Sequence, residues 1–277
     1  GAGDSSAPGF NVRVHQANKG SGTLANSIAR AEDQLAGVLI DPKTGQPYKN
    51  DIDTTTFSFD ANGIYTEPAT IGYEQGGGGP NGSIPGIPGV DGQNDNIALE
   101  AYAWLKLAPG TYTMIVNSDD GFRVSAGADA RDKLTSVVLG EYDGGRGTSD
   151  SVFQFSVSQA GLYSFRLLYF EGGGDANVYW FTSPSGDATT DQVLVNAADD
   201  NSVKAYRKVS ASVLPYVSYV KPGKDATGAS PSSGIKLKIE DGSPRKVDVA
   251  SVKLSLDGSA VAATVQNASV TWPISAR

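Results

Sequence analysis

Strand-length runs in which large apolar and polar residues alternate fill the middle of the chain, from position 99 to 182. The clearest are "VFQFSV" and "LYSFRLLYF", accompanied by the strand patterns "ALEAYAWLKL", "GTYTMIV", "FRVSAG", "VVLGEYDGG" and "ANVYWFT". Successive side chains of a strand point to opposite faces, so this period fits sheets that bury one face. The pattern predicts an all-β fold of the sandwich type.

The order of these runs suggests which strands pair. We expect "ALEAYAWLKL" to pair with "GTYTMIV" across the turn "APG", and "GLYSFRLLYFEGGG" to form a hairpin-like pair with "ANVYWFT". Residues 41–98 consist mostly of turn signals and predict a long excursion that is functional or covers a sheet edge. The glycine run in that excursion is not followed by Lys-Ser or Lys-Thr, so it does not predict a phosphate loop.

The composition excludes several classes of site. The chain has no cysteine, which excludes disulfides and thiolate metal sites. Its one histidine, His15, lies in a strand pattern without a nucleophile signature, so we expect a partly buried strand residue there. The net charge of −8 repels phosphate backbones, and we expect no nucleic-acid partner. No apolar run reaches membrane-spanning length, so we expect no membrane insertion. Acidic loops rich in Gly, Asn and Asp, in a chain without Cys, favour a secreted or cell-surface bacterial protein.

One segment, "SGTLANSIARAEDQLAGVL", has the period of an amphipathic helix and predicts a helix over 23–36. A single helix in a strand-rich chain is expected to pack on a sheet face. Its apolar stripe consists of Leu24, Ile28, Ala31 and Leu35. The candidate N-cap is Ser21 or Thr23, and Gly37 lies near the expected end of the helix.

The amino-acid composition changes near residue 209, after which the chain is rich in Val, Ser and Lys and poor in aromatic residues. We expect a flexible lead over 1–8, a sandwich over 9–209 and a separate module over 213–277. The last module alternates Ile235, Leu237 and Ile239 with lysines and carries an Asp257–Gly258 hairpin signal. It resembles the start of an immunoglobulin-like or cadherin-like module, although it holds fewer strands than a complete sandwich. Either the native chain continues beyond Arg277, or a neighbouring subunit supplies a strand, which would allow self-assembly.

The stretch "VNSDDGF" places two adjacent carboxylates, Asp119 and Asp120, at the end of a strand pattern. In a trans peptide, successive side chains on a strand point to opposite faces, whereas a cis peptide would bring both carboxylates to one ion. Calcium takes 6–8 oxygen ligands without a steep geometric demand. Taken alone, Asp-Asp-Gly is most often a plain turn, and the later "EGGG" a flexible tip.

Together these stretches resemble the domain family named after the fourteen-kilodalton domain of anthrax protective antigen. The resemblance covers about residues 97–182 and rests on a Gly-Tyr strand, a Ser-Asp-Asp-Gly turn, a second Gly-Tyr strand with an arginine, and a glycine-rich loop. The matching positions are Gly110, Tyr112, 118–121, Gly161, Tyr163, Arg166 and 171–174. Members of this family are β-sandwiches found in adhesins, flocculins, glycosidases and toxins, and several bind sugars through calcium.

The resemblance implies a cis bond between Asp119 and Asp120 and a calcium ion held by both side chains. It implies further ligands from Glu171, which stands where flocculins have asparagine, and from the backbone of Gly173 and Asp175. A sugar would replace two waters on the ion with vicinal hydroxyls, and the expected ligand-binding side chains are Asp119, Asp120, Glu171 and Asn177. Tyr142, Tyr179 or Trp180 could stack on the sugar, although a core role is the more usual one for each.

The sequence therefore predicts an all-β, protective-antigen-like sandwich with one added helix, followed by a partial immunoglobulin-like sandwich. Its predicted function is calcium-dependent binding of carbohydrate or polysaccharide, in adhesion or in targeting a larger protein, with no catalytic residues. The alternative from another class is a structural stalk or assembly module without sugar binding. A third interpretation is an accessory domain of an enzyme whose catalytic part lies elsewhere.

Overall fold

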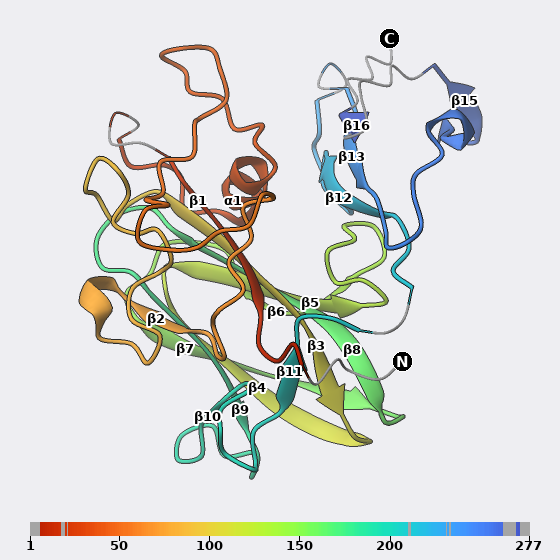
Figure 1. The fold of residues 1–277 in the computed structure, drawn as a ribbon. Coiled ribbons are helices and arrows are strands. Elements are labelled where there is room, and N and C mark those ends of the chain that lie inside the picture. Colours follow the sequence, from red (N-terminus) through yellow and green to blue (C-terminus); the bar gives the residue numbers. More distant parts are fainter. Residues whose placement is uncertain are drawn as a thin grey trace. The chain divides into compact units, whose positions relative to one another are not determined.

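The computed structural model describes residues 6–17, 20, 22–209, 212–230, 232, 234–262 and 270–271. The chain forms two compact units, one of Gly1–Ala126 and Val137–Ser210, the other of Gly127–Ser136 and Ala211–Arg277. The elements of the first unit are α1 (Ile28–Leu35), β1 (Asn11–Gln16), β2 (Gly72–Glu74), η2 (Gln75–Gly77), β3 (Ile97–Leu107), β4 (Gly110–Asp119), β5 (Gly121–Gly127), β6 (Val137–Tyr142), β7 (Ser149–Val157), β8 (Gly161–Glu171), β9 (Asn177–Ser183), β10 (Val193–Leu194) and β11 (Lys204–Tyr206) (Figure 1).

Two antiparallel sheets form the first unit. One has the order β1-β3-β8-β5-β6, with β11 also paired to β3, and the other has the order β10-β9-β4-β7, with β2 also paired to β9. Both sheets contribute to one buried apolar cluster that includes Leu99, Met114, Phe122, Leu167 and Trp180. The all-β sandwich predicted from the alternating pattern is confirmed.

Both predicted strand pairings are wrong. β3 and β4 lie in different sheets, and so do β8 and β9, because β3 pairs with β1 and β8 while β4 pairs with β7 and β9. Alternation reports which side chains share a face, but it does not report which strand lies alongside. As a result, between β3 and β9 the chain crosses between the sheets after β3, β4, β6, β7 and β8. The crossings after β4 and after β8 lie at the same end, where Asp119 is the register partner of Asn177.

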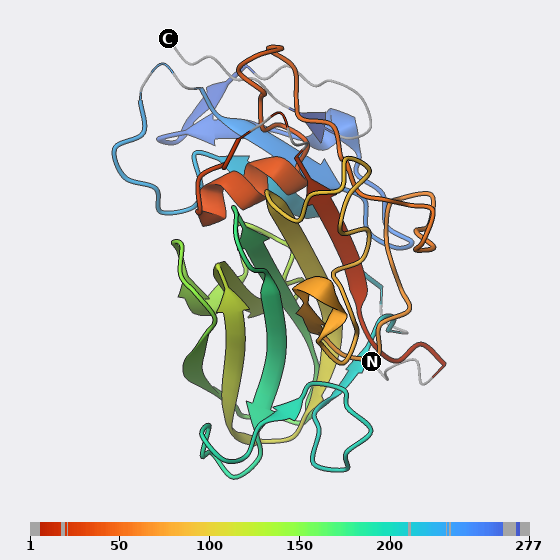
Figure 2. The same ribbon diagram turned by 90° about the vertical axis from the view of Figure 1, so that its left-hand side faces the viewer.

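The helix α1 packs on the outer face of the β3–β8 sheet. Ile28 and Ala31 form a buried cluster with Ala98, Leu168 and Phe170, whose neighbours in sequence face the main core. Figure 2 shows the helix, in orange-red, lying across the ends of the strands. Among the described residues no helix has the length and apolar character needed to cross a membrane.

The helix begins later than predicted. Its N-cap is Ser27, whose side chain accepts a hydrogen bond from the backbone N–H of Arg30, and its C-cap is Ala36. Thr23 lies before the helix, and Ser21 lies outside the described residues. The reason is tertiary: the backbone N–H of Leu24 donates to the Asn96 side chain, which holds the preceding segment away from helical geometry.

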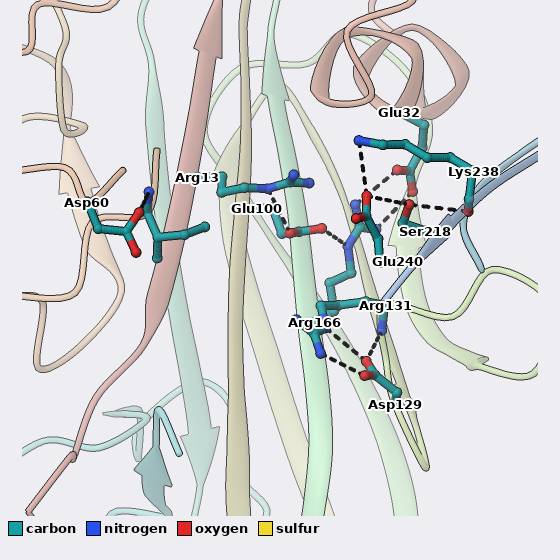
Figure 3. A network of polar contacts seen from close by, with 11 residues as sticks. Arg13, Glu32, Asp60, Glu100, Asp129, Arg131, Arg166, Ser218, Lys238 and Glu240 are labelled. Atoms are coloured by element: carbon teal, nitrogen blue, oxygen red, sulfur yellow. Dashed lines mark hydrogen bonds and ion pairs between the residues drawn. The ribbon is translucent and has the colours of Figure 1, made fainter. Parts of the chain in front are cut away.

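A buried ion-pair network fastens the helix to the sheet (Figure 3). Arg166 on β8 donates from both terminal nitrogens to Glu32 on α1, at 2.8 and 2.9 Å, and from Nε to Glu100 on β3. Glu100 also accepts from Arg13 on β1 at 3.2 Å. Burial lowers the pKa of Arg166, but the carboxylates of Glu32 and Glu100 outweigh that effect and raise it. The charges on this face therefore balance one another within the fold.

Two residues of the lead predicted over 1–8 contact the sandwich. Residues 1–5 of the lead expected to be flexible lie outside the described residues, but Ala7 is buried. The backbone N–H of Arg207 donates to the carbonyl of Ala7, and the Arg207 side chain donates to the carbonyl of Pro8. These two residues are tied to the strand end after β11.

The second unit contains β12 (Tyr216–Lys221), β13 (Lys236–Glu240), η3 (Val249–Ser251), β14 (Leu254–Leu256), β15 (Ser259–Val261) and β16 (Val270–Thr271). The β14–β15 hairpin turns at Asp257 and Gly258, both with positive φ, which confirms the predicted hairpin. Residues 263–269 and 272–277 of the predicted module lie outside the described residues. The immunoglobulin-like assignment stays a prediction.

Replacing Arg166 with methionine tests the network. The substitution keeps the apolar stem but leaves Glu32 and Glu100 without the buried guanidinium, so we expect a loss of about 3–5 kcal/mol in the free energy of unfolding. Urea denaturation followed by the fluorescence of Trp104 and Trp180, both in the first unit, measures it. The matched control is R123M, because Arg123 forms an exposed pair with Glu141 worth at most about 1 kcal/mol. Equal losses in the two variants would contradict the assignment.

Candidate metal centre

Three carboxylates from two strand ends converge where the chain crosses between the sheets. One carboxylate oxygen from each of Asp119, Asp120 and Glu171 lies within 4.8 Å of the others. Asp119 ends β4 and Asp120 follows it, whereas Glu171 ends β8 in the opposite sheet. The fold therefore brings together the three side chains that the sequence proposed as metal ligands.

The peptide bond between Asp119 and Asp120 is cis, as the family resemblance implied. The turn around it is held by two hydroxyls: the Ser118 side chain donates to the carbonyl of Asp120 at 2.8 Å, and the Tyr169 hydroxyl donates to the carbonyl of Asp119 at 2.6 Å. The following Gly121 is required by packing, because a Cβ there would lie 2.2 Å from the Phe170 ring. Each residue of the "SDDG" stretch thus has a structural part in the turn.

The carboxylate of Asp120 is oriented by backbone donors only. Its Oδ1 accepts from the N–H of Arg146 at 2.8 Å, and its Oδ2 accepts from the N–H of Gly172 at 3.1 Å. Gly172 directly follows Glu171, so this second bond ties the β4–β5 turn to the β8–β9 loop. Asp120 is buried, whereas Asp119 is only half-buried.

Glu171 is the most unusual member of the cluster. Its side chain is 0% exposed, and neither carboxylate oxygen has a hydrogen-bond partner. Burial, together with the negative charges of Asp120 and Asp119, raises the pKa of Glu171 to about 8. Burial and Asp120 also raise the pKa of Asp119. A buried carboxylate without a donor or counter-charge is costly, so the cluster is suited to a positive group that contacts all three side chains.

Two arginines lie beside the cluster, but their guanidinium nitrogens donate to groups other than the three carboxylates. Arg146 donates to the carbonyls of Ser118 and Asp120 and to the hydroxyls of Ser118 and Ser151. Arg30 donates to the carbonyl of Glu171 and not to its carboxylate. In the described part of the chain, none of the three carboxylates forms an ion pair with a basic side chain.

Neither arginine could be assigned to the site from the sequence. Arg146 lies in the loop "DGGRGT", and Arg30 lies inside the helix pattern. The glycines around Arg146 were the only local sign that the loop could pack closely against the turn.

The remaining predicted site residues occupy different environments. Gly173 and Asp175 are exposed in the β8–β9 loop, and the negative charge of Asp175 contributes to the raised pKa of Asp119. Asn177 is buried, and both ends of its amide have partners: it donates to Asn117 at 2.6 Å and accepts from Thr148 at 2.7 Å. Its side chain therefore stabilises the strand ends rather than presenting a free ligand atom.

The three aromatic residues that were candidates for stacking on a sugar also differ in their surroundings. Trp180 lies in the core between the sheets, so it does not face a ligand. Tyr179 donates its hydroxyl to Glu74 and stacks on Phe181 at 5.8 Å between ring centroids. Tyr142, at the end of β6, is 36% exposed and has the Arg146 guanidinium 4.4 Å from its ring centroid. Of the three, Tyr142 is the one near the loop that contacts Asp120.

The donor set fits a hard divalent cation. Carboxylate oxygens are the ligands that calcium and magnesium prefer, and the unpartnered oxygens of Glu171 are free to bind one. When bound, such an ion supplies a Lewis-acidic centre that can accept further oxygen ligands from outside the protein. Calcium suits an irregular set of ligands from loops better than magnesium, which demands near-ideal octahedral geometry.

A comparison with models of protein families finds no match, and a comparison with curated proteins finds none. Among solved structures, the chain is similar to the PA14 domain of an antifreeze protein (15% identity, 76% of this chain and 99% of that chain, TM-score 0.47). It is also similar to a PA14 sugar-binding domain from an RTX adhesin (16% identity, 73% and 99%, TM-score 0.46).

A third similar structure is the A domain of epithelial adhesin 9 from Candida glabrata, solved in complex with Galβ1-4GlcNAc (9% identity, 76% and 95%, TM-score 0.44). At these TM-scores the similarities identify neither the family nor the ligand of this chain.

The raised pKa of Glu171 predicts how the metal-free protein responds to pH. Between its ordinary value and about 8, the folded state holds a proton that the unfolded state releases, so the stability of the protein in chelator should fall as pH rises through this range. Urea unfolding at pH 5.5, 6.5, 7.5 and 8.5 measures the slope. Glu171→Gln should flatten it, whereas the exposed Glu67→Gln should leave it unchanged. A wild-type slope that Glu171→Gln does not alter would contradict the burial of this charge.

Proposed function

We propose that the first unit is a calcium-dependent carbohydrate-binding module of a secreted or cell-surface protein, acting in adhesion or in targeting to a polysaccharide. The observation that carries the proposal is the buried, unpartnered carboxylate of Glu171 beside Asp119 and Asp120. In this proposal the three side chains act as ligands of the ion and not as proton-transfer groups.

The charge of the cluster supports a divalent ion. Three ionised carboxylates carry three negative charges, and the neighbouring arginine donors are directed at carbonyls and hydroxyls. One calcium ion would leave a single net negative charge, which a partly solvated site tolerates. The exposed part of the β8–β9 loop, residues 173–175, would supply backbone carbonyls, for which Gly173 and Asp175 remain the proposed sources.

The unequal burial of the carboxylates supports a ligand from outside the protein. Asp120 and Glu171 are buried, whereas Asp119 is half-buried and the glycines at 173 and 174 are exposed. An ion held here would be covered on one side and open to solvent on the other. Two hydroxyls of a sugar could replace waters on the open side, and the half-buried Asp119 could accept a hydrogen bond from one of them.

The charge of the surroundings favours a neutral sugar. Asp175 adds negative charge next to Asp119, and Asp143 lies in the loop that also contacts Asp120. Uronic acids, sialic acids and sulfated glycans would bring further negative charge to this acidic rim. We therefore infer that the ligand class is neutral glycans with vicinal hydroxyls.

Calcium should stabilise the protein through this cluster. At a calcium concentration about 100-fold above the dissociation constant, the gain is about 2.7 kcal/mol, which thermal melts with calcium and with chelator detect. Asp120→Asn should abolish most of the gain. The matched control is Asp200→Asn, because Asp199 and Asp200 form a second adjacent acidic pair that is exposed. Equal melting temperatures with and without millimolar calcium would sink the proposal.

A glycan array tests the sugar. We expect binding to neutral glycans in calcium, none in chelator, and little to sialylated or sulfated glycans. Asp119→Asn should weaken binding even where calcium still stabilises the fold, because this side chain lies on the open side. Calcium-dependent stabilisation without binding to any glycan would instead support the structural-module alternative. Preferential binding to acidic glycans would contradict the argument from charge.

A further inference from the structure

A segment from the far N-terminal part of the chain contacts the acidic cluster. Residues 22–27 lead into α1, and the Asn26 side chain lies against two glycines that flank the carboxylates. A Cβ on Gly172 would be 2.2 Å from Asn26 Oδ1, and a Cβ on Gly145 would be 2.9 Å from Asn26 Nδ2 and 3.4 Å from Asp120 Oδ1. The absence of a Cβ at both positions leaves the space that the asparagine fills.

The amide oxygen of Asn26 has no partner. Oδ1 is buried and accepts no hydrogen bond, and it shares this condition with both carboxylate oxygens of Glu171. Gly172, which Asn26 contacts, follows Glu171 in the chain and donates its N–H to Asp120. Unpartnered oxygens from two distant segments therefore lie around one peptide unit, where a cation would be their common partner.

The fold holds Asn26 in this position through its neighbours. Arg30 donates from Nε to the carbonyl of Ala25 at 2.8 Å and from a terminal nitrogen to the carbonyl of Glu171 at 3.1 Å. One guanidinium thus bridges the residue before Asn26 and the most buried acid of the cluster. On the other side, the N–H of Ile28 donates to Asp143 at 2.7 Å.

The preceding residues are held in the same way. Asn96 accepts from the N–H of Leu24 at 2.8 Å and donates to the carbonyl of Gly22 at 2.6 Å. Its own N–H donates to the carbonyl of Gly172 at 3.3 Å. Arg30 on one side of Asn26 and Asn96 on the other connect the segment to the carbonyls of Glu171 and Gly172, so the fold fixes the position of Asn26.

We propose that the side-chain oxygen of Asn26 is a further, neutral ligand of the cation that Asp119, Asp120 and Glu171 hold. The proposal rests on the proposed calcium site and adds a residue that lies outside the region of family resemblance. A neutral oxygen completes the shell without adding a fourth negative charge. It also couples the ion to the segment before α1, so that ion binding and the docking of this segment stabilise each other.

Isothermal titration of calcium into the chelator-stripped full chain tests this ligand. Asn26→Ala should lower the calcium affinity on the order of tenfold or more. Asn26→Asp, which keeps an oxygen and adds charge, should bind at least as tightly as the wild type. Gly172→Ala should also lower the affinity, because its Cβ displaces the asparagine. The matched controls are Asn62→Ala, in an exposed turn, and Gly147→Ala, whose Cβ would meet nothing within 4 Å.

The outcomes separate the two proposals. Wild-type protein that binds no calcium would overturn the proposed function itself. Tight binding by both wild type and Asn26→Ala, with loss in Asp120→Asn, would overturn only the assignment of Asn26. Equal losses in Asn26→Ala and Asn26→Asp would also overturn the assignment of Asn26, because aspartate keeps both the shape of the side chain and the ligand oxygen. Melting temperatures in chelator check that each variant is folded.

Discussion

The carboxylate of Glu171 is the constraint on which the proposed site depends. It is fully buried, has no hydrogen-bond donor and faces two further carboxylates. Water cannot solvate the charge there, and no side chain of the described residues neutralises it by an ion pair. A structure that keeps such a group either keeps it protonated, as its raised pKa indicates in the metal-free state, or offers it a cation.

The two faces of β8 show how differently the fold treats buried charge. On the helix side, Arg166 is surrounded by Glu32 and Glu100, and each guanidinium nitrogen has an acceptor. At the strand end, Glu171 and its two neighbours lie beside Arg30 and Arg146, but these arginines do not form ion pairs with the three carboxylates among the described residues. The first cluster balances its charges and fastens α1 to the sheet, whereas the second is the one to which we assign a cation in our proposal.

The Arg166 network also helps to position the residues around the acidic cluster. By holding α1 against β3 and β8, the Arg166 network places the helix start, and therefore the segment with Asn26, beside the crossing strands. Arg30 completes the link, since it is buried in the helix and donates to the carbonyl of Glu171. The added helix is thus part of the site's construction and not only a cover for one sheet face.

The sequence alone determined the all-β class and singled out the three carboxylates that the fold brings together. Alternation reports the buried face directly, and the "SDDG" and "EGGG" stretches carry the three carboxylates in recognisable local patterns. Tertiary structure decided the strand partners, the N-cap at Ser27 and the placement of Asn26 and Arg30 beside the acidic cluster. Local pattern encodes a residue's face and propensity, but the pairing of strands and the meeting of distant oxygens depend on where the chain crosses between sheets. Asn177 shows the converse: its place in the loop after Glu171 suggested a ligand-binding side chain, whereas its amide is bonded to Asn117 and Thr148.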